Sequence, residues 1–73
     1  MEETPKAQVQ IGDRILVKTK SVLSFTGVLL ESDFVYTNIN SIVLKTSDSS
    51  RILTVIPKNE IIRVFTMDGE GEI

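Results

Sequence analysis

Few side chains in this 73-residue sequence have the chemistry of a catalytic or metal-binding site. Histidine and cysteine are both absent, which excludes disulfide bonds, the usual zinc ligands and the commonest general base. The carboxylates form no recognisable catalytic pair, so no reaction class can be assigned to them. We therefore expect a protein that is not an enzyme and that holds no metal or cofactor.

Five polar side chains lie where two apolar runs end. Asp33, Tyr36 and Asn38 follow the first run, and Lys58 and Asn59 follow the second. Three of them also have an ordinary structural explanation. Asp33 could hold a turn through its own backbone, Asn38 could occupy a left-handed loop position, and Tyr36 could pack at the rim of the domain. The sequence leaves open whether these residues form a binding site or serve only such structural roles.

Charge is spread unevenly along the chain, whose net charge is −2. Residues 12–66 contain seven basic and five acidic side chains, whereas the other acids lie in the two ends. Nucleic-acid binders that depend on electrostatics alone are more basic than this. Any contact with nucleic acid is therefore expected to be local and pocket-like.

Nothing in the composition indicates a membrane protein or a disordered one. Apolar residues make up 41% of the chain, and no run approaches the length of a membrane span or has the pattern of a secretory signal. We expect a cytoplasmic protein without membrane contact.

Five short runs with the two-residue period of a β-strand follow one another, separated by turn signals. They are Arg14–Lys20, Leu23–Glu31, Ile42–Thr46, Arg51–Ile56 and Ile61–Thr66. The connections are a loop over Phe34–Ser41, a turn at Ser47–Ser50 and a single 3₁₀ turn at Pro57–Glu60. We expect a flexible arm at residues 1–10, the folded domain at 11–66 and an acidic, flexible tail at 67–73.

Gly27 stands in the middle of the second run, where glycine would weaken an ordinary strand. Such a glycine marks a bend or the close passage of another strand. A strand that bends there can serve both halves of a small barrel. We therefore predict an all-β fold, a five-stranded barrel or sandwich; a strongly bent, closed or nearly closed antiparallel barrel is favoured because it leaves fewer unpaired edges.

The last two predicted strands are apolar on both faces, unlike a strand that is buried on one face alone. A tail or a neighbouring subunit could cover the second face, and in so short a chain a neighbouring copy is favoured. The predicted interface residues are Leu53, Val55, Ile62 and Val64.

Two motifs resemble those of the Sm-like (Lsm) family, and the resemblance implies the family's fold, a strongly bent five-stranded antiparallel SH3-like barrel. Phe25, Gly27, Leu29 and Asp33 match the first family motif without a gap, but Asn38 stands later than the family's asparagine. The segment Val55–Val64 follows the spacing of the second motif, with Pro57 and Lys58 in place of its Arg-Gly pair. The first half also resembles divergent Sm-like domains of mRNA-decapping and translational-repression factors, which bind proteins.

The resemblance implies a pocket for an unpaired base at the pore of a ring. Asp33 and Asn38 would supply the polar contacts, Tyr36 the stacking face and Lys58 a phosphate contact, and Asn59 would also belong to the RNA-binding set. One hypothesis is a homo-oligomeric ring that holds single-stranded RNA in RNA processing or turnover. The alternative is a protein-interaction or assembly module on the same barrel, without a base pocket.

Overall fold

The computed structural model describes residues 7–46 and 51–73, so the turn predicted at Ser47–Ser50 lies outside it. These residues form seven strands and one short 3₁₀-helix. They are β1 (Ala7–Gln8), β2 (Arg14–Thr19), β3 (Ser24–Tyr36), β4 (Ile39–Lys45), β5 (Leu53–Pro57), η1 (Lys58–Glu60), β6 (Ile61–Thr66) and β7 (Gly69–Glu72). The predicted all-β class is confirmed.

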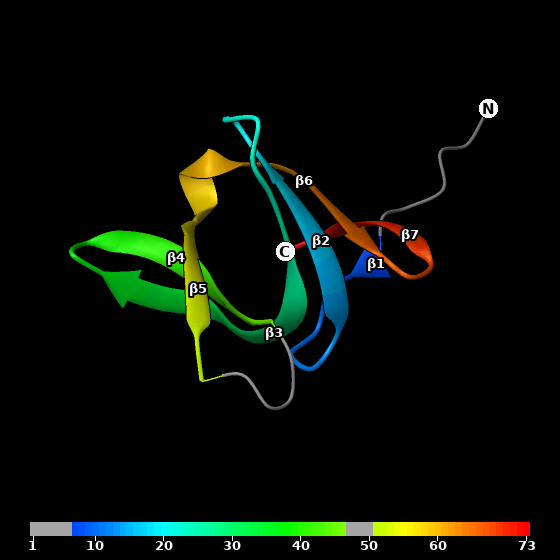
Figure 1. Ribbon diagram of the computed structural model, residues 1–73, viewed down its shortest axis with the longest axis horizontal. Helices are drawn as coiled ribbons and strands as arrows, with labels where there is room; N and C mark the ends of the chain where they lie inside the picture. The colour runs from blue at the N-terminus through cyan, green and yellow to red at the C-terminus, as the bar shows by residue number, and fades with distance from the viewer. Residues whose placement is uncertain (1–6, 47–50) are drawn as a thin grey trace.

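All seven strands belong to one sheet with the order β1-β7-β6-β2-β3-β4-β5. Strands β2 to β5 form an antiparallel meander, and β6 returns to pair with the other side of β2. Figure 1 shows β5 crossing in front of the curved β3, while β7 and β1 lie at the opposite end of the sheet. The five predicted strands are therefore all present, with the last at its predicted bounds.

The prediction of a five-stranded, closed antiparallel barrel is wrong in two respects. The sheet has seven strands, of which β1 and β7 are parallel, and among the described residues no ladder joins β5 to β6. Pro57 at the end of β5 has no N–H to donate, and η1 then turns the chain towards β2, where Lys20 N donates to Glu60 O at 2.8 Å. A hollow of about 190 Å³, lined partly by Phe25 and Val55, lies between β5 and the start of β3.

Residues on both sides of the domain predicted at residues 11–66 also join the sheet. Strand β7 pairs with β6, and β1 adds to β7. Val9 is buried in the core. Gly71 allows this close packing, because a Cβ there would lie 2.7 Å from Val9 Cγ2 and 2.9 Å from Thr66 Cγ2.

Gly27 has the role that the sequence predicted for it. A Cβ at this position would lie 2.7 Å from the carbonyl oxygen of Lys45, so the backbone of β4 passes directly over the glycine. Two register shifts follow in the β3–β4 ladder, between Leu29 and Glu31 and between Glu31 and Phe34. Together they give β3 the curvature seen in Figure 1.

The core is made by alternate residues of β2 to β6, together with Val9. Its fully buried members include Val17, Leu29 and Ile42. In β6 the alternation is interrupted at a register shift opposite Lys18 and Thr19. This irregularity turns Ile61 and Val64 to the same inner side. The two-sided apolar pattern of β6 therefore arises in part from this bulge and not from the burial of a second face.

The segment expected to be a loop at Phe34–Ser41 is the end of a long hairpin. Strand β3 continues past Asp33 to Tyr36, and β4 begins at Ile39. The turn contains only Thr37 and Asn38, whose φ angles are +48° and +64°. Positive φ at both positions is the backbone that matches the twist of a two-residue hairpin.

Candidate functional site

The predicted polar residues Asp33 and Lys58 are in contact. Lys58 Nζ donates to Asp33 Oδ1 at 2.7 Å, and Asn40 Nδ2 donates to the same oxygen at 3.3 Å. The three side chains come from η1, β3 and β4. They meet because Ser41 pairs with Pro57, which places the start of η1 beside the β3–β4 hairpin.

The Lys58 ammonium determines the electrostatics of this polar cluster, which we define as Asp33, Asn40 and Lys58. Its hydrogen bond, followed by that of the Asn40 amide, holds the pKa of the Asp33 carboxyl below its ordinary value. The side chain of Asp33 is 74% exposed, so water screens the ion pair. Lys58 is therefore already partnered by an anion, and the cluster has little net charge to offer a phosphate.

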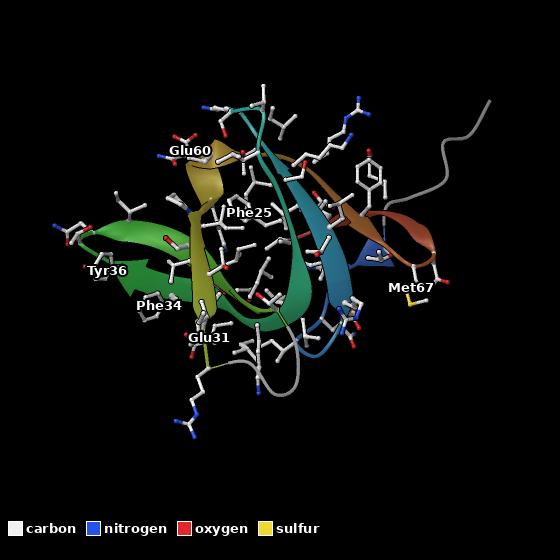
Figure 2. The ribbon with its side chains drawn as sticks, viewed as in Figure 1. Phe25, Glu31, Phe34, Tyr36, Glu60 and Met67 are labelled. Atoms are coloured by element: carbon white, nitrogen blue, oxygen red, sulfur yellow. The ribbon has the colours of Figure 1, made fainter. Side chains whose placement is uncertain are left out.

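Tyr36 lies on the other face of the hairpin. Its ring stacks on that of Phe34, with centroids 6.3 Å apart and planes 13° from parallel, and Figure 2 shows both rings side by side on β3. Since strand residues alternate between faces, Asp33 points away from both rings. The hydrogen bond from Asn40 to Asp33 agrees, because Asn40 is paired with Val35.

Asn38 and Asn59 are both exposed, and they belong to different segments. Asn38 occupies the hairpin turn in the left-handed conformation, which is the structural alternative that the sequence left open. Asn59 is the middle residue of η1, next to Lys58. The five predicted site residues therefore divide into a polar group at η1 and an aromatic group at the hairpin tip, and no described contact joins the two.

Sequence reasoning missed Asn40 and Phe34. Asn40 completes the polar cluster, and Phe34 forms the aromatic pair with Tyr36. Recognising a two-residue turn at Thr37 and Asn38 in the sequence would have predicted the positions of both residues. Such a turn fixes the hairpin register and thereby the face on which each side chain lies. The sequence lacks the glycine that usually signals such a turn.

Three of the four predicted interface residues are exposed apolar side chains. Leu53 and Val55 on β5 are 51% and 44% exposed, and Ile62 on β6 is 59% exposed. Val64 is buried opposite Val17, so its side chain belongs to the core of this chain.

Both strands that carry these exposed residues have an edge without a described ladder partner. Strand β5 ends the sheet, while β7 covers β6 only from Val64 to Thr66. Beside the uncovered half of β6 lies a groove of about 230 Å³, lined by Ile61, Ile62 and parts of β7.

Within residues 7–46 and 51–73 there is no helix of the length and apolar character needed to cross a membrane. In the same ranges, no three acidic side chains gather closely enough to hold a metal ion.

Comparison of the chain with protein-family models, with curated proteins and with solved structures finds no match.

Proposed function

We propose that this chain is a divergent Sm-like assembly module whose copies associate edge to edge. The observation that carries the proposal is the pair of open strand edges, one on β5 and one on the first half of β6, each with exposed apolar side chains. An open apolar edge is a template for pairing with another chain. Strand β5 of one copy would add to β6 of the next.

This pairing joins two different surfaces, so it is head-to-tail and closes into a ring if the rotation per copy allows it. On β6 the available edge is Ile61–Arg63, because β7 occupies the remainder. On β5, Leu53 and Val55 project from the same face. The new ladder would bury these side chains together with Ile62, and burial of apolar area would stabilise it by about 25 cal/mol for each Å² removed from water.

A second candidate function of the same assembly is the binding of single-stranded RNA, and the polar cluster favours this function. Asp33, Asn40 and Lys58 join the β3–β4 hairpin to η1, which are the segments that carry the family's base contacts. A ring would repeat these segments, so several weak sites would act on one strand. The separation of Tyr36 from the cluster favours assembly as the primary function, since a base stacked on Tyr36 would not reach Asp33.

The test is the molar mass in solution, measured by light scattering over a range of protein concentrations with and without a short oligo-uridine. We expect a defined oligomer. Ile62→Lys should reduce it to monomers, while Val22→Lys should not, because Val22 is fully exposed in the β2–β3 turn and away from both edges. A wild-type protein that remains monomeric at high concentration would refute assembly.

RNA binding is tested by titrating oligo-uridine, oligo-adenine and duplex into the wild-type protein at moderate salt. Stacking contributes about 1–3 kcal/mol per base, so Tyr36→Ala should weaken oligo-uridine binding clearly. Duplex should bind poorly, because the chain offers little counterion release. Binding that is unchanged in Tyr36→Ala and Asn38→Ala would rule out these residues as the base site.

A further inference from the structure

The outer face of β2 and β6 carries three cations, and neither of these strands contains an acid. Arg14, Leu16 and Lys18 alternate with the buried residues of β2, and Arg63 and Phe65 stand beside them on β6. We call these five residues the cationic face. On its other side, β3 contributes only uncharged residues, which are Ser24, Thr26 and Val28. The chain as a whole is net negative, and three of its eight basic residues lie on this face.

Lys18 and Arg63 are directly opposite each other in the antiparallel ladder. Opposed residues of this kind lie about 5 Å apart at their Cβ atoms, and like charges at that distance destabilise a sheet. Both side chains are exposed, and neither forms an ion pair with a described residue. On the neighbouring strand β7, Glu70 is paired with Phe65, and both Glu70 and Glu72 line one groove with Arg63. An unfavourable pair of cations kept on the surface is explained if an anion binds between them.

The apolar part of the face limits what that anion can be. Phe65 is partly buried, and the Lys18 ammonium lies 5.8 Å from its ring centroid. A nucleic acid would require free aromatic faces for its bases and a row of phosphate contacts. The face offers one ring that already has a cation over it, on a protein of net negative charge.

An extended acidic peptide fits the spacing better. Arg14 and Lys18 are four residues apart on one strand, which corresponds to about 13 Å, and Leu16 lies between them beside Phe65. A peptide in the extended conformation with two acids four residues apart and an apolar residue midway matches this order. Its carboxylates would meet the cations while its apolar side chain covers Leu16 and Phe65.

We propose that the cationic face is a docking site for an extended acidic peptide segment of a protein partner, with the pattern acid, any residue, apolar, any residue, acid. This site is a sheet face and not a sheet edge, so it does not depend on the edge pairing proposed above. A monomeric protein would bind the peptide equally well.

The experiment is fluorescence anisotropy with a labelled peptide of sequence Glu-Ser-Leu-Ser-Glu, blocked at both ends, at low and at moderate salt. We expect a dissociation constant below about 1 mM and weaker binding at the higher salt concentration. The Lys18→Ala/Arg63→Ala protein should bind about tenfold more weakly, with an unchanged circular-dichroism spectrum and a melting temperature no lower than that of wild type, because the charge repulsion is removed. Arg51→Ala is the matched control, since Arg51 is an exposed cation outside the face.

Two results would overturn the proposal. One is wild-type protein that binds the acidic peptide no better than the reversed-charge peptide Lys-Ser-Leu-Ser-Lys. The other is oligo-uridine that binds more tightly than the peptide and loses affinity in the same double variant, which would make the face a nucleic-acid site.

Discussion

Replacing Gly27 by alanine would place a methyl group where the structure has no room for one. The added Cβ would lie 2.7 Å from the carbonyl oxygen of Lys45, 3.1 Å from its carbonyl carbon and 3.3 Å from Leu44 Cβ. The first two atoms belong to the backbone of β4, which is fixed by ladders on both sides. The strain therefore cannot be relieved by rotating a side chain, and β3 and β4 must move apart.

The cost can be estimated from the effects that oppose each other. Overpacking of a well-packed site costs about 1–3 kcal/mol, while the lower backbone entropy of alanine in the unfolded chain returns about 0.4–1 kcal/mol. We expect a net loss of about 1–2 kcal/mol for Gly27→Ala. Gly27→Val adds two methyl groups against the same backbone, and its loss should be on the order of 3 kcal/mol or more.

The assay is thermal unfolding followed by circular dichroism. For a domain of this size, 1 kcal/mol corresponds to about 4–8 °C in melting temperature, so Gly27→Ala should melt about 5–15 °C below wild type. Thr26→Val, which changes the exposed neighbouring position, should stay within about 0.5 kcal/mol. Gly27→Ala that melts at or above the wild-type temperature would show that β4 does not pass over this glycine.

Three other changes test the hairpin, the edge and the polar cluster. Thr37→Asn should raise the melting temperature, since Thr37 is β-branched at a φ of +48° and asparagine tolerates that conformation better, by about 0.5–1 kcal/mol; a lower melting temperature would contradict the turn geometry. Leu53→Lys should prevent oligomers in sedimentation without unfolding the chain, because Leu53 is an exposed edge residue; unchanged oligomers would exclude the β5 edge. Asp33 has a lowered pKa in the native state because of Lys58, so its ionised form is stabilised by folding. The stability difference between wild type and Asp33→Asn should be present at neutral pH and should disappear as the pH falls below 3.8, the ordinary value for this carboxyl; a difference that grows in acid would mean that the sign is wrong.

The hairpin shows why the site could be predicted only in part. The residue types at Asp33, Tyr36 and Lys58 were recognisable in the sequence, and the resemblance to the Sm-like family implied that their two segments lie close together. The face of the sheet on which each side chain lies could not be recognised in the sequence, because it depends on strand register. A two-residue turn and two register shifts in β3 decide that Asp33 meets Lys58 while Tyr36 stacks on Phe34.

The last strands make the same point about the predicted interface. Ile62 and Val64 have the same parity in the sequence, and alternation alone would place them on one face. The irregularity in β6 leaves Ile62 exposed and Val64 in the core. Bulges of this kind arise from the pairing partner, so periodicity within one strand cannot locate them.

By itself the sequence determined the all-β class, the five strands β2 to β6, the 3₁₀ turn after Pro57 and the close approach of another strand at Gly27. These features follow from local rules, because alternation, proline and glycine act on the backbone where they stand. Only the tertiary structure decided that β1 and β7 join the sheet and that β5 and β6 leave it open. Strand β7 reads Gly-Glu-Gly-Glu, a sequence with little intrinsic tendency to form a strand. It is a strand because β6 supplies its hydrogen-bond partners, and that depends on where the whole chain places β6.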